Sequence, residues 1–171
     1  MPILKTDLWL PASLEDIWDF HKDPRNLLKI TPAMLKVKID LLPEQIVKGS
    51  ELLIHSESKI LKPFLKWTVL YEDWKEDEDY KMFKDSQSQG PFKSWHHTHE
   101  FIRGTRELVM GEKIVKAKLP GTWIKDTVEY ELKKQFKPFS FVAEKLLTKL
   151  FVFRKRTLLK LFNTKEELEV P

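Results

Sequence analysis

Residues 139–162 read FSFVAEKLLTKLFVFRKRTLLKLF, and their pattern differs from that of the rest of the 171-residue chain. Apolar residues recur there every three or four positions, at 139, 142, 146, 150, 153 and 161, with others at 147, 151, 158 and 162. This spacing predicts an amphipathic α-helix of about 24 residues with a wide apolar face. At about 1.5 Å per residue such a helix is about 36 Å long.

Much of the preceding chain alternates apolar and polar residues, which is typical of half-buried β-strands. The segments predicted as strands are 3–10, 34–42, 51–60, 66–74, 80–86, 95–102, 114–119 and 123–132. After the first strand, Ser13 is predicted to cap a short helix, which Asp23-Pro24 ends before a second short helix begins. An antiparallel sheet buries one face, and the long terminal helix is the natural cover for it, so the predicted fold class is α+β.

Composition excludes several classes of protein. The chain has no cysteine, so disulfides and thiolate zinc sites are excluded, and its five glycines make a dinucleotide-binding unit an unsuitable interpretation. There is no G-x-S-x-G motif, no N-terminal signal peptide and no apolar run of the length that spans a membrane. We therefore expect a cytoplasmic protein with a single domain over residues 1–163 and a polar tail over 164–171.

Charge is distributed unevenly along the sequence. The net charge is only +4, but residues 133–165 hold ten Lys and Arg against one acid, Glu144. Lys145, Lys149, Arg154, Lys155, Arg156 and Lys160 are predicted to form a basic surface on the long helix. This surface is either simply solvated or makes transient contact with an anionic membrane. No recognition motif for nucleic acid accompanies it.

Three of the five histidines lie within SWHHTHEF, residues 94–101. Alternation in a strand places His97 and His99 on the same face as two aromatic residues, Trp95 and Phe101, and places His96 on the other face. On the last predicted strand Asp126 shares a face with apolar residues at 124 and 128, so it is also expected to point inward. A buried carboxylate requires a partner, and one of the two histidines is the obvious candidate.

Three kinds of chemistry are open to His97, His99 and Asp126. They could form a two-histidine, one-carboxylate metal site, although the H-x-H spacing is weak evidence and no metal or cofactor is predicted from it. They could form a hydrogen-bonded polar patch in a cavity wall. They could also be catalytic residues, with a histidine held by Asp126 acting as a general base.

The chain resembles the START and birch-pollen-allergen superfamily of helix-grip folds, in particular its bacterial ligand-binding branch related to polyketide cyclase/dehydrase-like proteins. The resemblance covers residues 1–162 and is carried by LPASLEDIWDF (10–20), DPRNL (23–27), Thr31-Pro32, Lys48-Gly49, Trp67-Thr-Val, Gly90-Pro91-Phe92, W-x-H-x-H-x-F (95–101), GTWIKDxVEY (121–130) and Arg154. It implies a curved antiparallel sheet of six or seven strands wrapped around the long helix, with a cavity between them. Many members bind lipids, polyketides or other hydrophobic molecules, and some are enzymes.

The resemblance leads to a set of predicted ligand-binding residues and a predicted function. We expect a hydrophobic small molecule or a lipid to be bound in the cavity, with a cyclase or dehydrase enzyme and a peripheral membrane lipid carrier as alternatives. Residues 103–120 depart from the pattern of the branch and are predicted either to extend a hairpin or to cap the cavity. The predicted ligand-binding residues are Trp67, Val69, Tyr71, Trp95, His97, His99, Phe101, Asp126, Val128, Tyr130, Leu146, Leu150 and Phe153.

Overall fold

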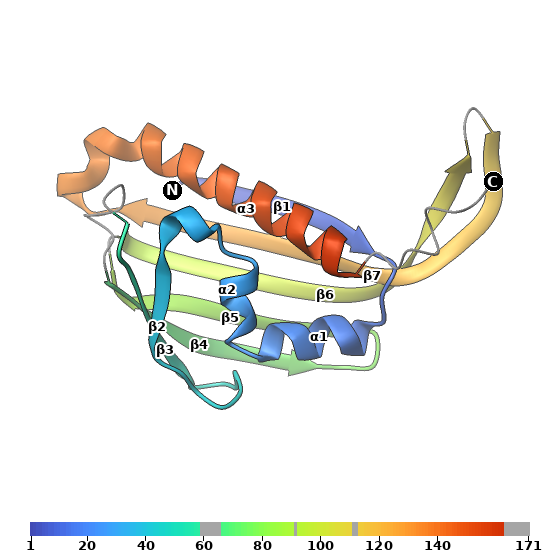
Figure 1. The fold of residues 1–171 in the computed structure, drawn as a ribbon, viewed down its shortest axis with the longest axis horizontal. Coiled ribbons are helices and arrows are strands. Elements are labelled where there is room, and N and C mark those ends of the chain that lie inside the picture. The colour runs from blue at the N-terminus through green and yellow to red at the C-terminus, as the bar shows by residue number, and fades with distance from the viewer. Residues whose placement is uncertain (59–65, 91, 111–112, 163–171) are drawn as a thin grey trace.

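Seven antiparallel strands form one curved sheet with the spatial order β1-β7-β6-β5-β4-β3-β2 (Figure 1). The computed structural model describes residues 1–58, 66–90, 92–110 and 113–162. The predicted polar tail, 164–171, therefore lies outside the described residues, as does the end of the strand predicted over 51–60. The strands are β1 Ile3–Leu10, β2 Val37–Leu41, β3 Glu51–Ser56, β4 Lys66–Glu76, β5 Tyr80–Gln89, β6 Phe92–Met110 and β7 Lys113–Leu132.

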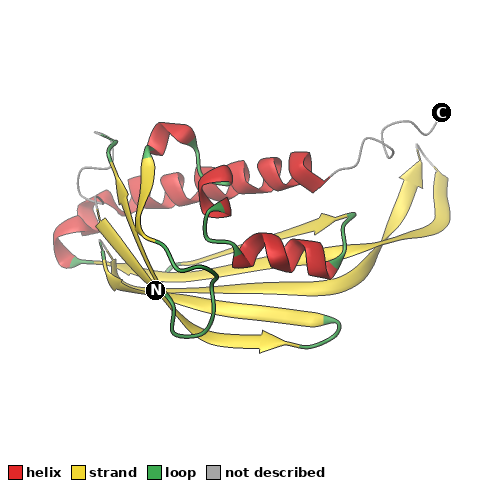
Figure 2. Cartoon of the chain, turned by 60° about the horizontal axis from the view of Figure 1, so that its bottom comes forward, coloured by secondary structure: helices red, strands yellow, loops and turns green. Residues whose placement is uncertain are grey.

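The helices lie on one face of this sheet, with the longest running across it (Figure 2). This arrangement confirms the predicted α+β helix-grip fold, in which a curved antiparallel sheet holds a long C-terminal helix. The helical elements are α1 Leu14–Lys22, α2 Asn26–Lys29, the 3-10 turn η1 Ala33–Leu35, the 3-10 turn η3 Lys134–Phe139, and α3 Ser140–Phe162.

The start of α1 follows the capping prediction. The Ser13 hydroxyl accepts a hydrogen bond of 3.0 Å from the backbone N–H of Asp16, which satisfies one of the free donors of the first turn. Acidic Glu15 and Asp16 in that turn also suit the positive end of the helix dipole. The apolar face of α1 is buried, and Trp18 from this face is only 1% exposed.

Residues 103–120 extend a hairpin, which is one of the two predicted outcomes. Strands β6 and β7 stay paired beyond the rest of the sheet, with Gly104 opposite Gly121 and Thr105 opposite Pro120. The segments predicted as separate strands, 114–119 and 123–132, are therefore parts of one strand, and the predicted break between them is wrong. Proline is tolerated here because β1 pairs with β7 only as far as Leu10 and Thr122, so no hydrogen bond to β1 is lost at residue 120.

The strand predicted over 34–42 is shorter than expected. Its first residues belong to η1, which is followed by Lys36 with a left-handed backbone (φ 44°), and β2 begins only at Val37. The side chain of Ser56 bonds to the carbonyl oxygen of Leu35 and holds this turn against β3. Alternation in the sequence does not reveal such a turn, because the apolar residues at 35, 37 and 39 keep the same spacing through it.

The hydrophobic core consists of two clusters beneath α3. One cluster gathers α1 and the centre of the sheet around Trp18, Phe83 and Phe101. The other packs the first half of α3, through Leu147 and Phe151, against aromatic residues of β6 and β7. A group of polar side chains described below lies on the inner face of the sheet between these clusters.

Candidate functional site

A cavity of about 340 Å³ lies between the sheet and α3. Its volume falls within the range of about 300–1,000 Å³ that is usual for small-molecule sites, and most of its lining side chains are apolar or aromatic. The walls are supplied by α1, α2, η1, β2, β3, β4, β5, β6 and α3. Eight of the predicted ligand-binding residues line it: Trp67, Val69, Tyr71, Trp95, His97, His99, Leu146 and Leu150.

The remaining five predicted residues are placed elsewhere within the part of the chain that the structure describes. Phe101 is fully buried in the cluster around Trp18, because it lies one strand alternation beyond the histidines and is covered by α1. Val128 and Tyr130 are buried under the first half of α3. Asp126 lines a smaller pocket of about 30 Å³ on the other side of the histidines. Phe153 is half-buried and lines neither pocket, because the phase of α3 turns residues 147, 151 and 154 inward.

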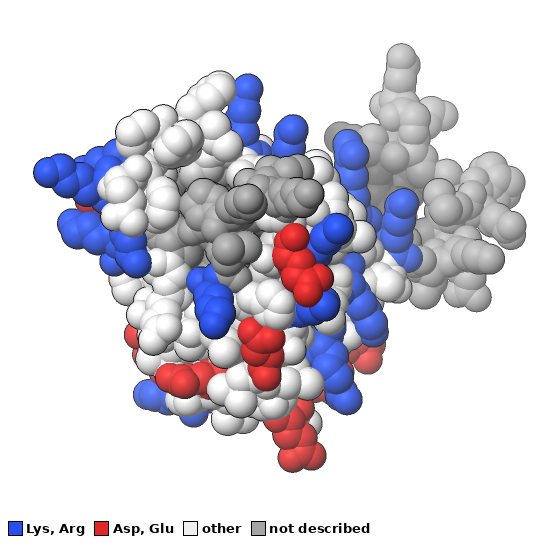
Figure 3. All heavy atoms as spheres, turned by 60° about the vertical axis from the view of Figure 1, so that its left-hand side comes forward, with Lys and Arg blue, Asp and Glu red and all other residues white. Residues whose placement is uncertain are grey.

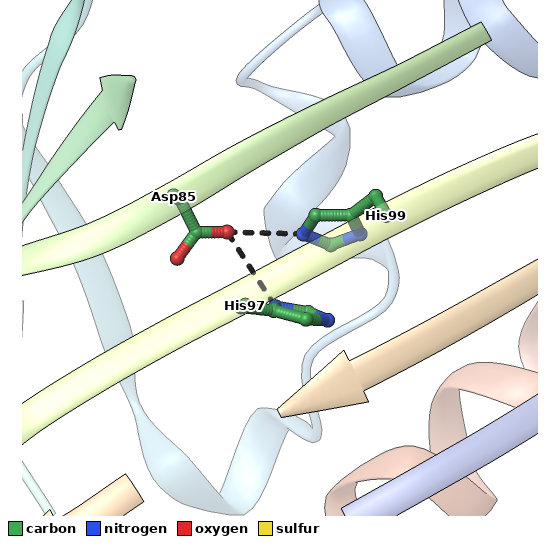
Figure 4. Close-up of side chains that lie close together, drawn as sticks. All are labelled: Asp85, His97 and His99. Carbon is green, nitrogen blue, oxygen red and sulfur yellow. Dashed lines mark hydrogen bonds and ion pairs between the residues drawn. The ribbon is translucent and has the colours of Figure 1, made fainter. Parts of the chain in front are cut away.

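Two histidines and two aspartates form a compact polar group in the cavity wall. The His97 and His99 rings lie against each other, with centroids 3.6 Å apart and ring planes tilted by 43°. Asp126 Oδ1 lies 3.1 Å from His97 Nε2 and 2.9 Å from His99 Nδ1. On the opposite side, Asp85 Oδ2 lies 3.5 Å from His97 Nδ1 and 3.0 Å from His99 Nε2 (Figure 4). Each imidazole therefore bridges the same two carboxylates.

Strand register explains why these four residues meet. Asp85 on β5 pairs directly with His97 on β6, and Asp126 on β7 pairs directly with His99. The group is thus built from three neighbouring strands in the middle of the sheet. His96 is exposed on the other face, as alternation predicted.

The carboxylate oxygens that do not face the histidines accept further hydrogen bonds. Trp95 Nε1 donates to Asp85 Oδ1 over 3.1 Å, and the hydroxyl of Thr6 on β1 donates to Asp126 Oδ2 over 3.4 Å. Each aspartate therefore keeps one oxygen for the histidines while its second oxygen is occupied. This satisfies most of the hydrogen-bonding capacity of the group without water.

The electrostatics of the group favour ionised aspartates. Burial opposes the charged form of Asp85 and Asp126, but the adjacent histidines outweigh burial and lower the pKa of Asp85 below its ordinary value. Hydrogen bonds from both rings hold the pKa of Asp126 well below its usual range. Both aspartates are therefore anions at neutral pH, and they demand positive charge or N–H donors in their surroundings.

The two histidines differ in spite of their similar partners. Burial, reinforced by the charge of His99, lowers the pKa of His97. Burial acts in the same direction on His99, but its hydrogen bonds to Asp126 and Asp85 outweigh it and raise its pKa. The group thus presents a neutral imidazole beside a more basic one at the cavity wall. Such a pair can donate a hydrogen bond to a ligand, accept one from it, or exchange a proton with it.

Arg154 brings a cation to the same place. Arg154 was predicted to lie on the basic surface, but it lines both pockets, with its guanidinium 5.2 Å from the Phe151 ring centroid. Its Nε atom is buried and has no hydrogen-bond partner. Burial lowers the pKa of Arg154, while the charges of Asp126 and Asp85 oppose that shift. The other basic residues predicted for this helix, Lys145, Lys149, Lys155, Arg156 and Lys160, are exposed.

Asp85 was not predicted as a site residue and Arg154 was predicted at the surface, although each left a signal in the sequence. Asp85 shares a strand face with Phe83, which places an acid among inward-pointing residues. Phe151 follows Leu147 by four positions and Arg154 follows Phe151 by three, which is the spacing of residues on one helix face. Leu158, four positions further on, lies on the same face. For Arg154, charge was taken as a sign of exposure, and the helical period pointed the other way.

The fold and its cavity define a helix-grip protein of the START and birch-pollen-allergen superfamily. The sequence matches the family described as polyketide cyclase / dehydrase and lipid transport over residues 10–152. The chain therefore belongs to that family, which supports a ligand-binding fold. No reaction is established by this membership, and catalysis by His97, His99 and Asp126 stays a prediction.

Solved structures show the same fold at low sequence identity. A norcoclaurine synthase of Thalictrum flavum, determined with a transition-state analogue, matches with a TM-score of 0.62 and 16% identity over 94% of this chain and 93% of that chain. Protein Ms6760 of Mycobacterium smegmatis matches with a TM-score of 0.54 and 14% identity over 93% and 89% of the two chains. A nucleoside-diphosphate sugar epimerase of Corynebacterium glutamicum matches with a TM-score of 0.61 and 20% identity. The match covers 92% of this chain but only 28% of the epimerase chain.

A search of the curated proteins found no match. Among the described residues, the helices are too short or too polar to cross a lipid bilayer.

Proposed function

We propose that this protein binds a hydrophobic small molecule or lipid in the cavity between the sheet and α3. The observation that carries the proposal is the cavity itself, which combines an apolar lining with one concentrated polar group. Side chains such as Val69, Leu146 and Leu150 offer a surface to the apolar body of a ligand. Ligand sites of this kind place a few polar groups among apolar walls to set the orientation of the ligand.

We expect the polar end of the ligand to lie against the polar group. Asp85, His97, His99 and Arg154 all line the same cavity. Tyr71 lines it too, and burial raises its pKa, so its hydroxyl remains protonated and can donate a hydrogen bond. A ligand with an apolar body and a polar end that both accepts and donates hydrogen bonds fits this wall best.

A cavity-filling variant tests the proposal. Leu146 lines the cavity, whereas Val142, one turn earlier on α3, is 52% exposed. We expect Leu146→Trp to weaken binding of a fluorescent apolar probe such as anilinonaphthalene sulfonate at least tenfold, and Val142→Trp to leave it unchanged. Native mass spectrometry of the purified wild-type chain should also show a bound apolar molecule. Equal probe binding by both variants would place the probe outside the cavity and count against the proposal.

A second candidate function, contact with a membrane surface during ligand transfer, is favoured by the start of α3. Phe139, Phe141 and Val142 are 55%, 64% and 52% exposed, which is unusual for side chains of this size. The ammonium group of Lys145 lies 4.2 Å from the Phe141 ring centroid, and Lys137 is also exposed. On the face drawn in Figure 3, Lys and Arg side chains border uncharged surface. Exposed aromatic residues among lysines are typical of segments that settle into an anionic lipid interface.

Vesicle sedimentation tests this second candidate. We expect the protein to sediment with vesicles that contain phosphatidylserine and to remain in the supernatant with purely zwitterionic vesicles. Phe141→Ser should reduce sedimentation severalfold, whereas Val152→Ser, on an exposed residue further along α3, should not. Binding that is indifferent to lipid charge or to Phe141 would contradict membrane docking and leave the cavity proposal untouched.

A further inference from the structure

Asp85, His97 and His99 bring three metal-binding atoms together at the cavity wall. One ligand atom from each residue lies within 4.8 Å of the other two. Asp85 and His97 are buried, and His99 is mostly so. Two imidazole nitrogens and one carboxylate oxygen form a donor set that divalent zinc and related first-row metals favour.

The separations between donor atoms suit one ion. Bonds of about 2.1 Å at tetrahedral or octahedral angles place neighbouring donor atoms about 3.0–3.4 Å apart. Asp85 Oδ2 lies 3.0 Å from His99 Nε2 and 3.5 Å from His97 Nδ1, close to this range (Figure 4). Small movements of the three side chains would therefore complete a coordination shell on this side of the rings.

Asp126 and Trp95 hold these ligands in the orientation that an ion requires. Histidines that bind metals commonly donate their other ring N–H to a carboxylate, which fixes the tautomer. Here Asp126 Oδ1 faces the other nitrogen of both rings, at 3.1 and 2.9 Å. Trp95 Nε1 donates to the second oxygen of Asp85 and leaves Oδ2 directed at the histidines. The chain thus supplies both the ligands and the groups that orient them.

The Asp85 side of the rings, rather than the Asp126 side, has the space for an ion and its further ligands. Asp85, His97 and His99 all line the cavity of about 340 Å³, whereas Asp126 lines the pocket of about 30 Å³. The two carboxylates attract a divalent cation, and the guanidinium of Arg154 offsets part of their charge. We propose that Asp85, His97 and His99 form a site for a divalent transition-metal ion of the zinc class, with open coordination positions that face the ligand cavity and Asp126 as a positioning residue.

Calorimetry with Zn²⁺ on tag-free, chelator-treated protein tests this proposal. We expect one ion per chain, with binding weakened more than 100-fold in Asp85→Asn and His99→Gln, and about 10–100-fold in Asp126→Asn. His96→Gln, on the exposed face of the same strand, should bind as the wild type does. Circular dichroism should establish that each variant is folded.

An experiment on the wild type alone covers the case in which a variant fails to fold. In NMR spectra, added Zn²⁺ should shift the ring signals of His97 and His99 before those of His55, which lies on the surface beside Asp40. Shifts confined to His55 or His96 would show adventitious surface binding and overturn the proposal. Zinc binding that survives in the folded Asp85→Asn and His99→Gln variants, or that depends more on Asp126 than on Asp85, would overturn it as well.

Discussion

His21 should make the stability of this protein depend on pH in a calculable way. Its ring lines both pockets, and the centroids of the His21 and Phe101 rings are 4.7 Å apart. The Nδ1 atom of His21 lies 2.7 Å from the carbonyl oxygen of Ile17. Burial lowers the pKa of His21 from 6.5 to about 4, and the hydrogen bond to Ile17 opposes that shift only in part. Among the charged groups that face it, His99 and Arg154 also lower the pKa, and Asp126 raises it.

The sign and size of the effect follow from proton linkage. Between about pH 6.5 and pH 4 the unfolded chain binds a proton at His21 that the folded chain does not bind, so folding becomes less favourable as pH falls. Above pH 6.5 this contribution is fully present. Each pH unit within the window costs about 1.4 kcal/mol, so lowering the pH to about 5 removes about 2 kcal/mol of the free energy of unfolding.

Urea unfolding at a series of pH values measures this effect. His21→Gln removes the titration, and its amide can still donate to the Ile17 carbonyl oxygen. We expect the free energy of unfolding of the wild type to fall about 2 kcal/mol further than that of His21→Gln between pH 7 and about pH 5. His96→Gln, which alters an exposed ring, should track the wild type. Parallel curves for wild type and His21→Gln would refute the reasoning.

Three other substitutions test the packing of the fold. Phe101→Ala should reduce the free energy of unfolding by about 3–5 kcal/mol in urea titrations, because the ring is fully buried among aromatic neighbours. Gly121→Ala should cost about 1–3 kcal/mol in the same assay, because a Cβ there would lie 2.3 Å from the Leu10 carbonyl oxygen, and an unchanged value would show that β1 can move aside. Lys38→Gln removes an exposed ion pair with Glu57 and should change the melting temperature very little, and a loss comparable to that of Phe101→Ala would contradict this expectation.

The fold was predictable from sequence because independent local signals agreed. Alternation, the Ser13 cap and the helical period after residue 139 each pointed to one element, and together they allow few arrangements. The family resemblance then indicated how the elements are assembled. The boundaries that were wrong, at residues 34–36 and between residues 119 and 123, depend on whether a neighbouring strand is present, which no local window reveals.

The candidate site was predictable only in part. Alternation correctly separated His97 and His99 from His96, and the inward face of Asp126 followed from the same rule. Asp85 was missed because its role depends on the register between β5 and β6, which sets it opposite His97. Alternation with Phe83 indicates that Asp85 points inward, but only the pairing of β5 with β6 shows that it meets the histidines.

The long β6–β7 hairpin also affects how copies of this chain meet one another. Within the described residues, β5 pairs with β6 only as far as Ile102, and β1 pairs with β7 only as far as Thr122. Beyond these points both arms carry open backbone edges, to which a strand from another molecule can add. Exposed Arg106, Glu107 and Lys118 charge these edges, and Pro120 lacks an N–H to offer. The arm thus carries its own protection against strand-to-strand aggregation, and replacing those charges with apolar residues would lower the concentration at which the protein stays dispersed.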